Sequence, residues 1–129
     1  MSKNLAREPG QRQLRVGEEL RHALAEVLGR DELRDPVMQG VSVTVSEVRV
    51  GPDLRHATAY VMPLGGGDVG DIIAVLNRAS AYLRGRVGRL VRLKYAPSFV
   101  FEADLTFDEA GKIDALLRQA RPPHGGDGA

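Results

Sequence analysis

Apolar residues recur at helical spacing in the first part of the chain. Between Gln11 and Gly29 they fall three or four positions apart, at Val16, Leu20, Ala23, Leu24, Val27 and Leu28. Gly29 is suited to end this helix, because glycine is the usual residue at a helix C-terminus. Pro36 would not continue it, so we predict a turn over residues 31–38.

The segment 41–45 (VSVTV) alternates between apolar and polar residues and predicts a strand with one buried face. The alternation slips by one position at Ser46–Glu47, which indicates a β-bulge. Residues 51–54 (GPDL) have the composition of a turn, and residues 56–63 read as a returning strand. Together these segments predict an antiparallel hairpin.

A second helical region is predicted over residues 69–88, with Asp68 or Asp71 as its N-cap. Gly88 is expected to end this helix. The alternation that starts at Val91 predicts the beginning of a last strand there.

The ends of the chain differ in composition from its middle. Residues 108–117 suggest a short closing helix, whereas residues 1–10 and 119–129 predict a flexible N-terminus and a disordered C-terminal tail. The residues between these ends, 11–118, are predicted to form one domain. We predict an α+β fold in the order helix–strand–strand–helix–helix–strand, which is that of a type II KH domain, with the helices on one face of a three-stranded sheet.

The composition fits one soluble domain, since 43% of the 129 residues are hydrophobic and 27% are charged. The chain contains no cysteine, which excludes disulfides and thiolate chemistry. No apolar run approaches the length of a membrane span, and the first ten residues are too polar for a signal peptide. We therefore expect a cytoplasmic protein that does not contact membranes.

The net charge of +1 conceals a strongly basic segment. Residues 72–101 contain no Asp or Glu, and their cationic residues are Arg78, Arg84, Arg86, Arg89, Arg92 and Lys94. The chain on either side of this segment is net negative. A local excess of positive charge in a nearly neutral chain suggests one anionic partner that docks at one place.

A helical wheel separates these cations from the apolar positions. The stripe predicted to face the sheet consists of Ile72, Leu76, Ala79, Ser80, Leu83, Val87 and Leu90. Arg78, Tyr82 and Arg89 fall on the opposite side, beside the small residues Ala81 and Gly85. Guanidinium groups suit phosphate contacts, and a tyrosine ring can stack on a base. The pattern favours a nucleic-acid surface over a solvated helix face whose cations are neutralised by acids from elsewhere in the fold.

Other motif-like strings are weaker. Residues 85–88 (GRVG) match the GxxG loop with which KH domains clamp nucleotides. However, no helix fits between them and the strand predicted at Val91, so we interpret them as a helix end. Residues 65–67 (GGG) lack the Lys-Ser/Thr continuation of a phosphate-binding P-loop.

No pattern indicates a catalytic or metal site. The histidines have no metal-ligand spacing and are scattered at His22, His56 and His124. Acidic residues at Asp108–Glu109 are explained by the dipole of the predicted helix, and no nucleophile motif occurs. We therefore predict neither an enzyme nor a cofactor.

The chain resembles bacterial ribosome-binding factor A from about residue 11 to residue 117. The segments that carry the resemblance are residues 12–28, Asp35–Pro36, residues 43–48 (VTVSEV), Asp53–Leu54, residues 57–61, residues 76–84 (LNRASAYLR), residues 91–94 (VRLK) and residues 97–101 (PSFVF). Each is weak alone, but their order and spacing together are fairly specific.

This resemblance implies a KH-like RNA-binding protein that associates with free, immature small ribosomal subunits. It would assist late maturation of 16S rRNA near its 5′ end and the decoding-region helices, often in the cold, with assembly GTPases as further partners. Family members have an Ala-x-Gly kink between two helices instead of a GxxG loop. Here the kink falls at Ala79-Ser80-Ala81, where Ala81 replaces the glycine, so a kinked and a continuous helix both stay open.

The predicted RNA-binding residues are Arg78, Ser80, Tyr82, Arg84, Arg86, Arg89, Arg92 and Lys94, with Arg12 and Arg15 as lesser candidates. The cations would contact phosphates of 16S rRNA, and the two hydroxyl residues would add backbone or stacking contacts. We expect a monomer. Two alternatives are a general binder of single-stranded RNA or DNA, and a protein–protein adaptor that uses a sheet edge.

Overall fold

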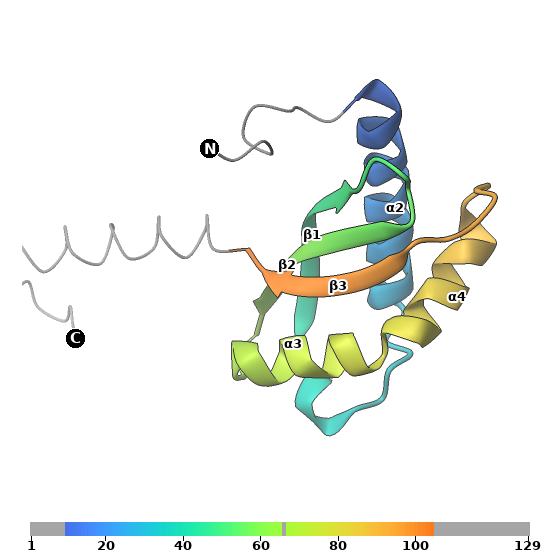
Figure 1. Ribbon diagram of the computed structural model, residues 1–129. Helices are drawn as coiled ribbons and strands as arrows, with labels where there is room; N and C mark the ends of the chain where they lie inside the picture. Colours follow the sequence, from blue (N-terminus) through green and yellow to red (C-terminus); the bar gives the residue numbers. More distant parts are fainter. Residues whose placement is uncertain (1–9, 66, 105–129) are drawn as a thin grey trace, which may run out of the picture.

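A computed structural model describes residues 10–65 and 67–104 of the chain (Figure 1). In chain order these residues form α2 (Gln11–Gly29), the 3-10 helix η1 (Pro36–Met38), β1 (Ser42–Val50), β2 (His56–Leu64), α3 (Val69–Arg78), α4 (Ser80–Leu90) and β3 (Ser98–Ala103). The predicted α+β order is confirmed. The predicted tails and the closing helix at residues 108–117 lie outside the described residues, so they stay predictions.

The described strands form one mixed sheet of three strands in the order β1-β2-β3. β1 and β2 are the predicted antiparallel hairpin, whereas β3 pairs with β2 in parallel. The register of the hairpin shifts between Val45 and Glu47, where a bulge was expected. Because the bulge adds one residue, Val45, Val48 and Val50 are all buried on the same face.

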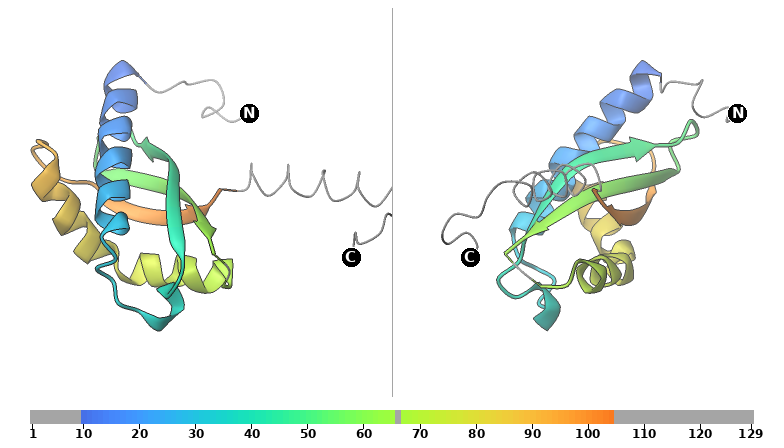
Figure 2. Two further views of the ribbon diagram at one scale, coloured as in Figure 1. Left: turned by 180° about the vertical axis from the view of Figure 1, so that it is seen from behind. Right: turned by 90° about the vertical axis from the view of Figure 1, so that its left-hand side faces the viewer.

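The helices cover one face of this sheet (Figures 1 and 2). α2 packs against β1, α3 and α4 pack against β3, and α2 also meets α4. Fully buried side chains fill the space between these elements, among them Leu20, Leu24, Val61, Ile72, Leu76, Leu83, Val87 and Phe101. Along β3, buried side chains such as Phe101 alternate with exposed ones. Val100 is 51% exposed on the opposite face of the sheet.

Gly17 allows α2 to lie close to β1. A Cβ atom at this position would lie 2.5 Å from the carbonyl oxygen of Val48, well inside van der Waals contact. Although glycine is a poor helix former, any side chain here would push the helix away from the strand. Gly17 therefore sets the spacing between α2 and the sheet.

The second helical region is broken at Ala79, which separates α3 from α4. Ala79 has φ −90° and ψ 8°, and no residue from 79 to 81 has a positive φ. Alanine adopts this conformation without the strain of the left-handed region, so the break does not require a glycine at position 81. Side chains on both sides of the break bind β3. Asn77 donates to the carbonyl of Phe101 and accepts from its N–H, and Ser80 donates to the carbonyl of Phe99.

The prediction of a strand at Val91 and of a helix end at Gly88 is wrong. α4 continues through Gly88 to Leu90, residues 91–97 form no regular element, and β3 begins only at Ser98. Val91 and Leu93 are half-buried against the core, which produces an alternating pattern without any strand pairing. Leu90 is 42% exposed rather than buried as the helical wheel predicted.

Candidate nucleic-acid interface

Most of the predicted RNA-binding residues lie on or next to α4. Arg78 ends α3, and Arg92 and Lys94 follow α4 in the irregular segment of residues 91–97. The predicted residues on α4 itself are Ser80, Tyr82, Arg84, Arg86 and Arg89. Arg12 and Arg15 are exposed in the first turns of α2, at the far end of that helix from its linker to η1 (Figure 1).

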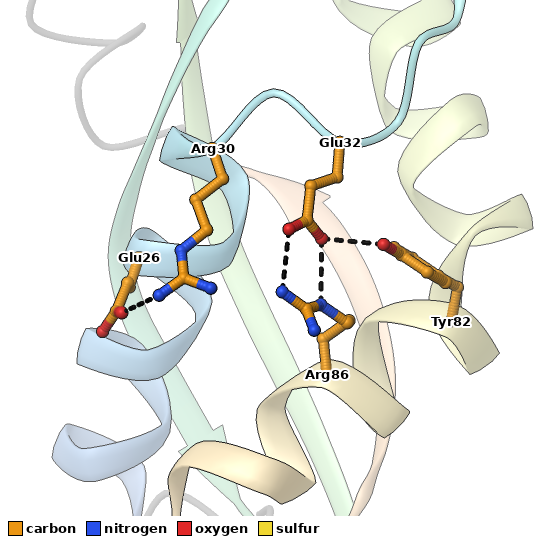
Figure 3. Close-up of polar contacts among 5 residues, drawn as sticks. All are labelled: Glu26, Arg30, Glu32, Tyr82 and Arg86. Atoms are coloured by element: carbon orange, nitrogen blue, oxygen red, sulfur yellow. Dashed lines mark hydrogen bonds and ion pairs between the residues drawn. The ribbon is translucent and has the colours of Figure 1, made fainter.

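Glu32, in the linker of residues 30–35, accepts hydrogen bonds from two side chains of α4 (Figure 3). The Arg86 guanidinium binds it in bidentate fashion, with Nε to Oε1 at 2.9 Å and Nη2 to Oε2 at 2.8 Å. The Tyr82 hydroxyl donates to Oε1 at 2.7 Å. The side chains of Arg86 and Glu32 are only 25% and 24% exposed. Arg86 is therefore engaged within the fold rather than projecting into solvent.

This cluster shifts the pKa of each member. The hydrogen bond from Tyr82, and then that from Arg86, lower the pKa of the Glu32 carboxyl. The same contacts with Glu32 raise the pKa of the Tyr82 hydroxyl and of the Arg86 guanidinium. Each shift favours the bound arrangement, in which Glu32 is ionised and Tyr82 keeps its proton.

Asp35, in the same linker, lies near Arg78 at an Nη2–Oδ2 distance of 3.8 Å. The Arg78 side chain is 68% exposed there, so the pair is long and solvated. Asp35 also accepts from the backbone N–H of Val37 and caps η1. Acids from elsewhere in the fold thus neutralise Arg86 closely and Arg78 only weakly.

The other cations of this region lack an acidic partner among the described residues. We call them the α4 basic segment and define it as Arg84, Arg89, Arg92 and Lys94. Arg84 donates its Nε to the carbonyl of Ala96 at 2.9 Å. The Lys94 ammonium lies 5.7 Å from the ring centre of Tyr95. All four residues are exposed, so their charge is directed to solvent.

Ser80 and the small residues of α4 have different roles. The Ser80 hydroxyl donates to the carbonyl of Phe99 at 2.7 Å, which commits it to holding α4 on β3. Ala81, Gly85 and Gly88 are exposed along α4, and a Cβ added to Gly85 would meet nothing within 4 Å. The helix surface is thus low at Gly85, in a stretch of sequence rich in arginine.

A hollow that the sequence did not indicate lies beside α4. It has a volume of about 450 Å³ and is lined by Arg55, His56, Arg84, Tyr95, Ala96 and Ser98. Arg55 and His56 were not predicted as site residues. They reach the hollow because His56 pairs with Ser98 across the parallel strands, a contact that no local sequence pattern signals.

The described residues contain no group of three or more His, Cys, Asp or Glu side chains placed to hold a metal ion. Within the same ranges, no helix has both the length and the apolar character needed to cross a membrane.

Comparisons with known proteins identify the family. The family model described as ribosome-binding factor A matches residues 12–117. A ribosome-binding factor A from Paramagnetospirillum magneticum is 57% identical over 112 residues, which cover 87% of this chain and 79% of that protein. The crystal structure of ribosome-binding factor A from Thermus thermophilus matches with a TM-score of 0.59 and 26% identity, over 70% of this chain and 94% of that one.

A third match is a homology model of the Thermus thermophilus factor fitted into a cryo-electron microscopy map of its complex with the 30S subunit. It has a TM-score of 0.57 and 27% identity, and it covers 69% of this chain and 91% of that one. Because the family model and a close relative both span most of the sequence, the chain belongs to the ribosome-binding factor A family.

Proposed function

We propose that this protein binds the free small (30S) ribosomal subunit and assists late processing and maturation of 16S rRNA without catalysing a reaction. Membership of the family is the observation that carries this proposal. The homologue fitted into a 30S complex supports the small subunit as the partner. We place this activity in the cytoplasm, with a role in the cold and with assembly GTPases as further partners.

The proposed mechanism is electrostatic docking of the α4 basic segment on rRNA. Phosphate contacts supply most of the affinity of such complexes, and each one releases counterions from the nucleic acid. Arg84, Arg89, Arg92 and Lys94 have exposed charges available for these contacts. The low helix surface at Gly85 would admit an RNA backbone that a side chain would keep at a distance.

The contacts inside the fold suggest a different role for Arg86. Its bidentate hydrogen bond to Glu32 holds α4 against the linker of residues 30–35. Arg86 therefore positions the helix and is not a primary RNA contact. Ser80 has a similar positioning role through Phe99. Docking would then hold one rRNA conformation until maturation proceeds.

Charge reversal at Arg89 and Arg92 tests the proposal. We expect Arg89→Glu and Arg92→Glu to weaken co-sedimentation with free 30S subunits. Each should lower the slope of log Kd against log salt by about 0.7–0.9, the contribution of one phosphate contact. Arg86 is unsuitable for this test, because a carboxylate there would face Glu32.

Arg49→Glu is the matched control, because it changes the charge equally on the opposite face of the sheet, where the side chains of Arg49 and Glu47 are 63% and 53% exposed and solvent screens a pair of carboxylates. Unchanged subunit binding in the Arg89→Glu/Arg92→Glu double variant, with the fold intact, would refute the docking mechanism. Equal binding to short RNA oligonucleotides and to whole subunits would favour a general single-stranded binder instead.

A further inference from the structure

The hollow beside α4 has the composition of a nucleotide site. Two of its lining residues, His56 and Ser98, begin β2 and β3, and its volume of about 450 Å³ is within the range of small-ligand pockets. Two arginines, a histidine, a tyrosine and a serine contribute to its lining, and none of the lining residues is acidic. An anionic ligand would therefore meet attraction without a competing carboxylate in the lining.

The fold holds the walls of this hollow in place. The backbone N–H of Ser98 donates to the carbonyl of Arg55 at 2.9 Å, which joins the starts of β2 and β3. Arg84 is fixed from α4 by its Nε bond to the carbonyl of Ala96. Its two terminal nitrogens have no partner among the described residues. Arg84 can thus donate to a ligand from a side chain that is already oriented.

Tyr95 gives the hollow an aromatic surface. Tyr95 is 63% exposed, so the packing of the core does not account for its position. The Lys94 ammonium lies 5.7 Å from the ring centre, at a distance typical of a cation–π contact. An exposed ring next to guanidinium groups matches the way proteins bind single nucleotides, in which the base stacks and the phosphate pairs with arginine.

We infer that this hollow binds one nucleotide, with Arg55 and Arg84 on its phosphate and the Tyr95 ring against its base. The inference rests on the proposed function in that rRNA is the expected source of the nucleotide. It adds Arg55, His56 and Tyr95 to the interface, at the end of the sheet next to the α4 basic segment.

Substitutions at Tyr95 and Arg55 give different signatures in subunit binding. Tyr95→Ala should weaken binding to free 30S subunits about tenfold, the loss of one stacked base, with an unchanged salt slope. Tyr95→Phe keeps the ring and should retain binding. Arg55→Gln should lower the salt slope by about 0.7–0.9, the loss of one phosphate contact. Arg49→Gln, with the same change of charge outside the hollow, should do neither.

Titration of the protein with uridine 5′-monophosphate and, in parallel, with inorganic phosphate distinguishes a free nucleotide from a nucleotide of rRNA. If the backbone amide resonances of Arg55, His56 and Ser98 shift with uridine 5′-monophosphate but not with inorganic phosphate, free nucleotide is a ligand. Effects of the substitutions on subunit binding alone would identify an rRNA nucleotide. Both outcomes support the site. Equal shifts with inorganic phosphate would reduce it to an anion site and overturn the inference.

Failure here is distinguishable from failure of the proposed function. If Arg89→Glu and Arg92→Glu weaken subunit binding while Tyr95→Ala and Arg55→Gln change neither subunit binding nor the nucleotide titration, the nucleotide site is refuted and the docking mechanism stands. If none of the substitutions has any effect, both are refuted.

Discussion

Substitution of Gly17 by alanine sets two physical effects against each other. Alanine favours a helix interior over glycine by about 1 kcal/mol. The added Cβ, however, would lie 2.5 Å from the Val48 carbonyl oxygen, and ordinary contact begins at 3.4 Å. The helix or the strand must therefore give way by about 0.9 Å, and overpacking of this kind costs about 1–3 kcal/mol. The difference between these two effects is a net loss of up to about 2 kcal/mol in the free energy of unfolding.

Chemical denaturation measures this loss, with Gly85→Ala as the matched control. Gly85 also lies inside a helix, but its added Cβ would meet nothing within 4 Å. Only the propensity effect remains there, so Gly85→Ala should raise the free energy of unfolding by about 0.5–1 kcal/mol. The two Gly→Ala substitutions should differ in sign. If Gly17→Ala also stabilises the protein, the close contact between α2 and β1 is not as described.

Two further predictions concern side chains that join distant parts of the chain. Asn77→Ala removes both hydrogen bonds to the Phe101 backbone and should lower the free energy of unfolding by about 1–2 kcal/mol in denaturant titrations. An unchanged free energy of unfolding in this variant would contradict this. The pKa of Glu32 is lowered from 4.5 by the bonds from Tyr82 and Arg86, so its ionised form stabilises the fold above pH 4.5, and this contribution disappears as the pH falls through the lowered pKa. Thermal melts of the protein and of Glu32→Gln should therefore differ near neutral pH and converge in acid, and a difference independent of pH would count against the ionised cluster.

Local patterns were sufficient to predict the hairpin but not the last strand. The shift in alternation at Ser46–Glu47 is a property of adjacent residues, so the bulge was visible in the sequence. β3 pairs in parallel with β2, far away in the chain, and nothing local marks where that pairing starts. The pattern at Val91 and Leu93 comes from half-burial against the core, which imitates a strand in sequence alone.

The candidate site could be predicted only in part, because its contacts also join residues that are far apart in the chain. The predicted helix over residues 69–88 included Arg86, but the sequence could not show Glu32, 54 residues away, as its partner. Whether a cation is available for RNA depends on such long-range neutralisation rather than on its own position. The hollow was missed because Arg55 and Tyr95 come together only through the β2–β3 pairing.

The hydrogen bonds of Asn77 and Ser80 also affect how this protein meets other copies of itself. β3 is an outer strand of the sheet, and its unpaired backbone groups would ordinarily form a template for another chain. The Asn77 amide occupies both backbone groups of Phe101, and Ser80 occupies the carbonyl of Phe99, so the helices close this edge with side chains. Sheet extension through β3 is thereby blocked at its centre, which protects this edge against pairing with another copy while α4 stays open to a partner of different chemistry.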